Sequence, residues 1–337
     1  MDLFLNILLL LLGFFMLVKG ADLFVDGSSA VAKIMKIPSI IVGVTVVSLG
    51  TSLPEFAVST AAAIKGSNEI ALSNVLGSNL FNLLVVLGTT AVLASKPVPV
   101  KRSLLKMEFP LNFIMTGVLG IMAIDYLIKG GIYESGNLFT PANGSIKTGV
   151  IGRMDGIIIL VVFIIFMVLT VKAALKARRE AADEEVGDVM PVWKAAVFIV
   201  IGAVAIKFGG DFVVSAATVI AGTFGMSETL IGLTIVACGT SLPELVTSVV
   251  AAKKDECDLA VGNVIGSNLF NILFILGLST TIHPVEAISS SVVDIIVLFV
   301  MGGIAYLFAF TKDSVNRKEG LVMVASYVVY LVYIIMR

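Results

Sequence analysis

The sequence predicts an all-α polytopic membrane protein with ten transmembrane helices in two inverted five-helix repeats. Three observations lead to this fold class: an apolar composition, ten long apolar segments and an internal repeat. Of the 337 residues, 58% are hydrophobic and 14% are charged, whereas soluble domains average about 45–50% apolar and about 25% charged residues. The net charge of −1 indicates no nucleic-acid partner, and one histidine with two cysteines does not make a zinc site.

Ten segments have the roughly 20 mostly apolar residues that a spanning helix needs. The first starts with Met-Asp and has no small-residue cleavage site before Lys19, so we expect a retained helix rather than a signal peptide. The first and sixth segments are long and are expected to tilt or to extend past the bilayer. The ten spans are expected near residues 3–33, 38–64, 70–94, 104–129, 155–173, 192–222, 227–253, 258–284, 288–311 and 319–336.

The distribution of lysine and arginine predicts the orientation in the membrane. With the N-terminus outside, the cytoplasmic loops and adjoining helix ends carry sixteen Lys and Arg residues, against five on the opposite side. We therefore expect a multi-pass protein of the plasma membrane with its N-terminus outside. A mixed-charge stretch at 175–191 is predicted to be a cytoplasmic linker between a first repeat, residues 1–174, and a second repeat, residues 192–337.

An internal repeat relates the two halves of the chain. GVTVVSLGTSLPE at 43–55 recurs as GLTIVACGTSLPE at 232–244, and NVLGSNLFN at 74–82 recurs as NVIGSNLFN at 263–271. The offset is 189 residues in both cases, so the two motifs span 43–82 and 232–271. Because five spans are an odd number, the copies are expected to cross the membrane in opposite directions. Inverted repeats in secondary transporters place the substrate site at the bilayer midplane, on broken helices.

The motif Gly-Thr-Ser-Leu-Pro-Glu predicts cation ligands at a helix break. Pro54 has no N–H and clashes with the carbonyl of Gly50, four residues earlier. Free carbonyls at membrane depth are tolerated only where they line a cavity or are buried in protein. Thr51 and Glu55 are four residues apart and share a helix face. The second copy repeats this arrangement and ends on Glu244.

The second motif adds further oxygen ligands. Ser78 and Asn82 are four residues apart, and Ser267 and Asn271 are their partners in the second copy. Sites made only of oxygen suit hard cations, and Ca²⁺ takes six to eight oxygens. Two carboxylates carry a charge of about −2, which one Ca²⁺ or two Na⁺ would balance. A bound cation would also offset the roughly 2.5–3.5 kcal/mol that each charged side chain costs at the bilayer centre on insertion scales.

Structural explanations exist for each motif taken singly. A proline often only kinks a transmembrane helix, and Gly-Ser-Asn can serve close helix packing. Their joint duplication in opposed copies favours the ion site. Asp22 and Asp211 also share the offset of 189, but without a proline break or clustered oxygens. We therefore expect these two aspartates to be structural, pairing with Lys19 or Lys207.

The paired motifs resemble the α-repeats of the sodium/calcium exchangers, within the cation/calcium antiporter superfamily, and the short linker resembles the prokaryotic type. The resemblance covers nearly the whole chain and implies a core of spans 2, 3, 7 and 8, across which spans 1 and 6 slide. It implies Na⁺ and Ca²⁺ as transported ions, with no cofactor and no obligate protein partner besides the lipid bilayer. The ion ligands it implies are Glu55, Glu244, Thr51, Ser52, Thr240, Ser241, Ser78, Asn82, Ser267 and Asn271, with the carbonyls of Ser48 and Ala237.

Departures and alternatives refine this hypothesis. Asn271 stands where some microbial and potassium-dependent relatives carry Asp, which favours potassium independence. A third Na⁺ per cycle would make the exchange electrogenic. A proton/calcium antiporter is the nearest alternative, although its typical Gly-Asn-Ala-x-Glu motif is absent from the sequence. A cation channel needs no duplicated gates. An enzyme needs a nucleophile–base pair, and Ser52 and Ser241 have no His or Lys at local spacing.

Overall fold

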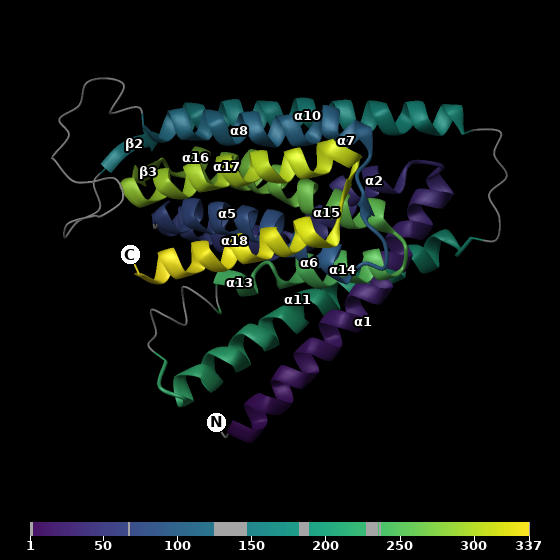
Figure 1. Cartoon of the computed structure of the whole chain (residues 1–337), viewed down its shortest axis with the longest axis horizontal. Coiled ribbons are helices and arrows are strands. Elements are labelled where there is room, and N and C mark those ends of the chain that lie inside the picture. Colours follow the sequence, from purple (N-terminus) through teal and green to yellow (C-terminus); the bar gives the residue numbers. More distant parts are fainter. Residues whose placement is uncertain are drawn as a thin grey trace.

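A computed structural model describes residues 3–66, 68–124, 147–181, 189–226, 235 and 237–336. The described chain is a bundle of helices with two small two-stranded sheets (Figure 1). Eight helices are long and apolar enough to cross a membrane, and a bent pair, Ser39–Thr51 with Leu53–Lys65, makes a ninth candidate. The chain is a polytopic membrane protein. The remaining predicted span, 227–253, lies partly outside the described residues, which show α13 (Ala237–Gly239) and α14 (Leu242–Lys253).

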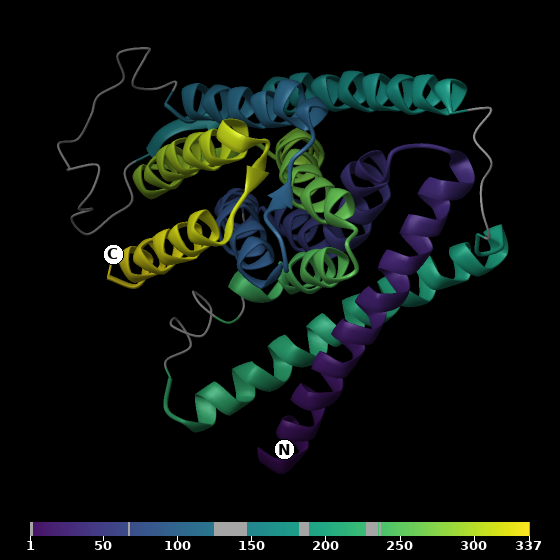
Figure 2. The ribbon, with the colours of Figure 1, turned by 45° about the vertical axis from the view of Figure 1, so that its right-hand side comes forward.

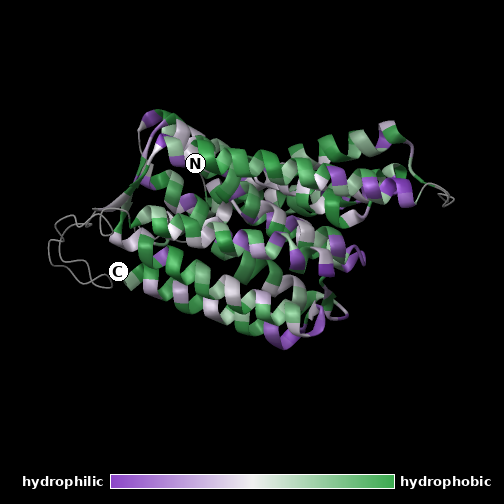
Figure 3. Cartoon of the chain, turned by 90° about the horizontal axis from the view of Figure 1, so that it is seen from above, coloured by the Kyte–Doolittle hydropathy of each residue, from purple (hydrophilic) through white to green (hydrophobic). Residues whose placement is uncertain are grey.

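Four helices present much of their apolar surface to the outside of the bundle. They are α1 (Leu3–Met35), α10 (Arg153–Glu180), α11 (Val192–Thr223) and α18 (Arg317–Met336), and 17–28% of the residues in their most apolar windows are buried. Figure 3 shows apolar residues along most of the outer helices, with hydrophilic residues mainly near their ends. In water such a surface would aggregate, whereas lipid acyl chains solvate it.

The core contains two largely buried spans, each interrupted by a π-helical turn. One contains α5 (Asn68–Phe81), a π-helical turn η2 (Asn82–Val86) and α6 (Leu87–Leu93). The other contains α15 (Cys257–Leu269), a π-helical turn η4 (Phe270–Leu276) and α16 (Gly277–Ile282). Their apolar windows are 72% and 94% buried. π-Helical turns inside α-helices are frequent at functional sites, and these two begin at or beside Asn82 and Asn271.

The helix break predicted at the first Pro-Glu motif is confirmed. The chain runs through α2 (Ser39–Val42), a π-helical turn η1 (Gly43–Val47) and α3 (Ser48–Thr51), then bends by 52° into α4 (Leu53–Lys65). Pro54 lies in the first turn of α4, where its missing N–H removes no helical hydrogen bond. Pro243 has the same position in α14, so both motif glutamates lie in the first turn of a helix.

The long helices α1 and α11 pack tightly against each other and cross beside the rest of the bundle (Figure 2). Glycines permit this close approach. A Cβ added at Gly13 would come within 2.8 Å of the Gly209 carbonyl oxygen, and one at Gly202 within 2.7 Å of the Phe24 nitrogen. Small residues at a helix crossing let two membrane helices associate through van der Waals contact. The two helices therefore form a closely fitted pair.

The remaining spans form a second layer on the core. They are α7 (Arg102–Lys106), continued by α8 (Glu108–Ala123), and α17 (Ser289–Lys312). The predicted span 104–129 ends earlier than expected as a helix, at Ala123, and residues 125–129 lie outside the described residues.

Two expectations of the sequence need correction. The fold is not purely helical, because β1 (Val98–Pro99) pairs with β4 (Ser314–Val315), and β2 (Lys147–Ile151) pairs with β3 (Val285–Ile288), both antiparallel. Pairings of two to five residues between segments more than 100 residues apart leave no periodic signal in the sequence.

The second correction concerns the predicted linker at 175–191, whose first part continues α10 as far as Glu180. Lys176 and Glu180 pair at i,i+4, 3.8 Å apart. Arg178 and Arg179 lie in the last turn, where positive charge complements the helix dipole. Residues 182–188 of the predicted linker lie outside the described residues.

Candidate ion-binding site

Two fully buried glutamates lie at the centre of the candidate site. Glu55 lies in the first turn of α4 and Glu244 in the first turn of α14, and both are 0% exposed. Each carboxylate accepts a hydrogen bond from a serine of the opposite motif. The Ser52 hydroxyl donates to Glu244 Oε1 at 2.9 Å, and the Ser241 hydroxyl donates to Glu55 Oε1 at 3.0 Å. This exchange brings together residues 186 and 192 positions apart.

A second serine reaches each carboxylate from the core helices. The Ser78 hydroxyl on α5 donates to Glu55 Oε1 at 3.4 Å, and the Ser267 hydroxyl on α15 donates to Glu244 Oε1 at 3.5 Å. One oxygen of each glutamate is therefore held by two hydroxyl groups, one from each half of the chain. The geometry repeats at equivalent positions of the two motifs.

Several other oxygens of the site have no partner among the described residues. They are Glu55 Oε2, Glu244 Oε2, Thr240 Oγ1, Asn82 Oδ1 and Asn271 Oδ1. Buried polar groups are nearly always hydrogen-bonded, and each unsatisfied one costs about 1–3 kcal/mol. No lysine, arginine or histidine in the described part of the chain forms an ion pair with either glutamate. The arrangement combines two uncompensated carboxylates with neutral oxygens, and a hard cation satisfies both.

Hydrogen bonds join most side chains of the predicted ligand set around the two glutamates. Asn82 and Asn271 are buried without a bond to either glutamate, and Thr240 is half-buried with no partner among the described residues. Thr51 donates to Asn263 Oδ1 at 3.0 Å and lies 3.5 Å from the Ser267 hydroxyl. The Ser48 carbonyl accepts the Ser52 N–H at 3.0 Å. The Thr51 hydroxyl also lies 3.3 Å from this carbonyl, but its one proton is donated to Asn263, so the Ser48 carbonyl can still accept a further ligand. Ala237 is the first residue of α13.

Four asparagines that the sequence argument did not select organise this region. The Asn74 side-chain amide donates to the Ser59 hydroxyl at 2.9 Å and to the Glu55 carbonyl at 3.3 Å. Asn263 makes the equivalent bonds, to the Ser248 hydroxyl at 2.9 Å and to the Glu244 carbonyl at 3.4 Å. These bonds fix the helix turn that carries each glutamate.

The other two asparagines, Asn79 and Asn268, join the core helices. Each donates from its side-chain amide to the other's backbone carbonyl at 3.2 Å, and Asn271 donates to Asn79 Oδ1 at 3.0 Å. The signal for all four asparagines was available, because each belongs to the duplicated Asn-x-x-Gly-Ser-Asn motif.

The two halves of the site differ in access. A cavity of about 830 Å³ reaches Thr240 and Pro54 and is lined by α4, α11 and the start of α14. Leu242 and Val246, on the corresponding face of α14, instead pack against a buried apolar cluster that includes α1 residues. Thr51 is hydrogen-bonded and Thr240 is not. The cavity therefore reaches the edge of the site on the α11 side, whereas α1 covers the opposite side, and the two glutamates themselves are fully buried.

Comparison with known proteins decides the family. The family described as sodium/calcium exchanger protein matches residues 5–172 and 194–336, both halves of the chain and nearly its whole length. The chain belongs to this family. It is a prokaryotic-type member, because its similar full-length relatives and solved structures are of that type.

Relatives and solved structures agree with this assignment. CaxA of Alkalimonas amylolytica is 35% identical over 329 residues, covering 95% of each chain. The sodium/calcium exchanger MaX1 of Methanosarcina acetivorans is 31% identical, covering 97% of each chain. A structure of the sodium-calcium exchanger NCX_Mj, soaked with Na⁺ and Sr²⁺, is 29% identical with a TM-score of 0.79, covering 98% of this chain and 99% of that one. This exchanger is accordingly a cation/calcium antiporter of the membrane, and its family is one of transporters.

Proposed function

We propose that this exchanger moves Na⁺ against Ca²⁺ by alternating access, with the ions bound between Glu55 and Glu244. The observation that carries the proposal is the state of these carboxylates. Both are fully buried, each has one oxygen held by two serines, and each has one oxygen with no partner among the described residues. A buried carboxylate without a counter-charge is costly at membrane depth. A transported cation offsets that cost, and hence the loaded carrier changes sides more easily than the empty one.

The ligand set proposed for the ions contains the two glutamates and neutral oxygens from both halves of the chain. Ca²⁺ accepts six to eight oxygens in flexible geometry, and the described side chains offer enough. The set is Glu55, Glu244, Thr51, Ser52, Thr240, Ser241, Ser78, Asn82, Ser267 and Asn271, with the carbonyls of Ser48 and Ala237.

We propose that a third Na⁺ binds in each cycle. One Ca²⁺ or two Na⁺ already neutralise the two carboxylates, so a third Na⁺ makes the sodium-loaded carrier positive and the exchange electrogenic. Asn271 supplies an amide rather than a third carboxylate, so K⁺ has no additional acid to pair with at that position. We therefore propose that transport is independent of K⁺ and carries net charge.

We further propose ten transmembrane helices in two inverted five-helix repeats, residues 1–174 and 192–337, joined on the cytoplasmic side, in a plasma-membrane protein whose N-terminus is outside. The recurrence of contacts at a fixed offset supports this. Asn74 and Asn263 make matching bonds, and Asn79 and Asn268 bond each other reciprocally, each pair being 189 residues apart. Equivalent contacts in two opposed copies provide equivalent gates on the two sides.

The test is calcium uptake into vesicles containing the purified full-length chain. Vesicles loaded with sodium are compared with sodium-free vesicles and with vesicles carrying only a pH gradient, with radioactive calcium outside. We expect uptake that needs the outward sodium gradient and that disappears in Glu55→Gln and Glu244→Gln. The matched control is Glu69→Gln, because Glu69 is an exposed acid in the first turn of α5, outside the duplicated segments 43–55 and 74–82.

Three results would change the assignment. Uptake driven by the pH gradient alone would indicate proton/calcium exchange, and uptake without any counter-ion would indicate a channel. Uptake that requires K⁺ would contradict the role given to Asn271. Electrogenicity is read from the same vesicles with the membrane potential clamped. If three Na⁺ leave per Ca²⁺ that enters, an inside-positive potential accelerates uptake.

A further inference from the structure

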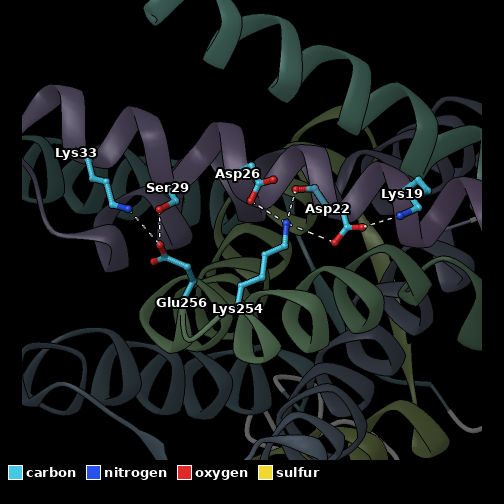
Figure 4. A network of polar contacts seen from close by, with 7 residues as sticks. All are labelled: Lys19, Asp22, Asp26, Ser29, Lys33, Lys254 and Glu256. Carbon is cyan, nitrogen blue, oxygen red and sulfur yellow. Dashed lines mark hydrogen bonds and ion pairs between the residues drawn. The ribbon is translucent and has the colours of Figure 1, made fainter. Parts of the chain in front are cut away.

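A network of charged side chains ties α1 to the end of α14 (Figure 4). The Lys254 ammonium lies 2.7 Å from Asp26 Oδ1 and 3.4 Å from Asp22 Oδ1, and it donates to the Asp22 carbonyl at 3.0 Å. Asp22 also pairs with Lys19 of its own helix at 3.5 Å. The predicted pairing of Asp22 with Lys19 is thus confirmed, and the structure adds a partner for Asp22 across the helix interface, Lys254.

A second contact extends the same connection by two turns of α1. The Ser29 hydroxyl donates to the Glu256 carboxylate, and the Lys33 ammonium lies 4.0 Å from that carboxylate. Glu256 immediately precedes α15. Together these contacts hold α1 against the α14–α15 connection, on the covered side of the ion site.

The repeat places a second lysine and a second aspartate at equivalent positions. Lys65 lies 189 residues before Lys254, as Asp22 lies 189 before Asp211. Each lysine directly precedes a residue with left-handed backbone, Gly66 at φ 73° and Asp255 at φ 60°. The two helix ends therefore share a left-handed residue directly after the lysine.

The equivalent residues Lys65 and Asp211 do not pair with each other in this structure. Asp211 pairs with Lys207 of its own helix at 2.5 Å, and both residues line the 830 Å³ cavity that separates α11 from α4. No ion pair among the described residues joins Lys65 to an acid. The predicted pairing of Asp211 with Lys207 is confirmed. Asp22 thus has a partner across the interface and Asp211 does not.

The tight α1–α11 packing couples the two interfaces. The contacts of Gly13 with Gly209 and of Gly20 with Gly202 are related by the repeat, since Gly13 and Gly20 correspond to Gly202 and Gly209. A further contact, of Gly27 with Ala195, has no such counterpart, because position 216 is Ala. A pair fitted this closely moves more easily as one unit than by separation. A displacement that lifts α1 from α14 therefore carries α11 toward α4 and closes the cavity.

We propose that the two lysines form a reciprocal ionic latch, a proposal that rests on the alternating access proposed above. Lys254 bound to Asp22 and Asp26 closes the predicted cytoplasmic side in this structure. After the switch, Lys254 is released and Lys65 binds Asp211, which closes the external side. The external latch is the weaker one, because Ser215 stands where the other half has Asp26.

The strength of such a latch suits a gate that opens in every cycle. The side chains are partly exposed, Lys254 by 30%, Asp22 by 33% and Asp26 by 47%. Partly exposed ion pairs contribute little because water and salt screen them. Loss of one latch is therefore expected to shift the balance between the two conformations by roughly two- to fivefold, rather than to lock the carrier.

The test measures the populations of the two conformations by the rate at which an introduced cysteine reacts with a membrane-impermeant maleimide. The protein is the full-length chain in nanodiscs, with its own Cys238 and Cys257 replaced by alanine. Ala57 lines the open cavity, and Val246, at the equivalent position 189 residues later, packs under α1. Ala57→Cys reports the external opening and Val246→Cys the cytoplasmic one. We expect Ala57→Cys to react quickly and Val246→Cys slowly.

Opposite shifts are expected from the two lysines. Lys254→Met raises the labelling rate of Val246→Cys about two- to fivefold and lowers that of Ala57→Cys. Lys65→Met shifts both rates the other way. Asp211→Asn is made together with Lys207→Met and compared with Lys207→Met alone, because Asp211 pairs with Lys207 in this structure. In that background Asp211→Asn shifts the rates as Lys65→Met does, and adding Lys65→Met shifts them no further, because both changes remove the same interaction. Lys253→Met is the matched control, since Lys253 is the exposed neighbour of Lys254 and forms no ion pair among the described residues.

Equal effects of Lys254→Met and Lys253→Met would overturn the latch on the cytoplasmic side. A shift of the same sign from Lys65→Met and Lys254→Met would overturn the reciprocity. The labelling rates do not depend on which ion drives transport. If calcium uptake does not depend on sodium but the labelling shifts are as expected, the proposed function is rejected and the latch is supported. If uptake depends on sodium but the labelling shifts are absent, the latch alone is rejected.

Discussion

Removal of the Asn263 side chain is expected to cost more stability than removal of its counterpart Asn74. Asn263 is fully buried, donates to Ser248 and to the Glu244 carbonyl, and accepts from Thr51. Asn74 is half-buried and makes the first two kinds of bond, but no bond to Thr240 is present. The two variants therefore differ by one interhelical hydrogen bond and by access to water.

The magnitude follows from the number of bonds lost. Side-chain hydrogen bonds between membrane helices average about 0.6 kcal/mol each. Asn263→Ala is then expected to lower the free energy of unfolding by about 2 kcal/mol and Asn74→Ala by about 1 kcal/mol. Because Asn263 fixes the turn that carries Glu244, its variant should also bind Ca²⁺ more weakly. Asn74→Ala should do the same through Glu55, to a smaller extent.

The assay is heat denaturation of the purified protein in detergent, with the folded fraction measured by size-exclusion chromatography, with and without Ca²⁺. One kcal/mol corresponds to roughly 2–4 °C for domains of 150–250 residues. Asn112→Ala is the control, because Asn112 is buried in α8 and its amide oxygen has no partner among the described residues. Equal midpoints for Asn263→Ala and Asn112→Ala, or a larger loss for Asn74→Ala, would refute the reasoning.

Three further predictions follow from particular contacts. Gly266→Ala is expected to lower the free energy of unfolding by about 1–3 kcal/mol, because the added Cβ would meet the Val44 Cα at 2.6 Å. Gly77→Ala is expected to be neutral, because nothing lies within 4 Å of a Cβ at this equivalent position. Equal denaturation midpoints of the two variants would contradict this. Tyr330→Phe removes the hydrogen bond from the tyrosine hydroxyl to Asp294 Oδ1 at 3.0 Å, so we expect a lower denaturation midpoint and unchanged calcium uptake. Altered uptake would instead indicate that Asp294 takes part in transport. Lys176→Ala breaks the ion pair with Glu180, whose two side chains are 78% and 69% exposed, so the denaturation midpoint should not change measurably. A clearly lower midpoint would mean that the end of α10 packs against another part of the protein.

The sequence alone determined the membrane class, the main spans and the central acids. Apolar runs report spanning helices because the bilayer excludes unpaired backbone, and this requirement acts locally along the chain. The duplicated Gly-Thr-Ser-Leu-Pro-Glu motif identified Glu55, Glu244 and the helix break at Pro54, since a proline and a carboxylate at membrane depth are each expensive. The duplication of Asp22 and Asp211 with nearby lysines also predicted their own-helix ion pairs.

Only the tertiary structure decided which equivalent contacts are made. The repeat places Lys65 and Lys254 at equivalent positions, yet of these two lysines only Lys254 pairs with an aspartate of α1 or α11 among the described residues. The exchange of Ser52 and Ser241 between the two carboxylates joins residues nearly 190 positions apart. The sequence contributes to the asymmetry, because Ser215 stands where the other half has Asp26. Both halves nevertheless carry the lysine and the aspartate, and only the packing of α1 and α11 against the core decides that Lys254 is the lysine engaged in this conformation.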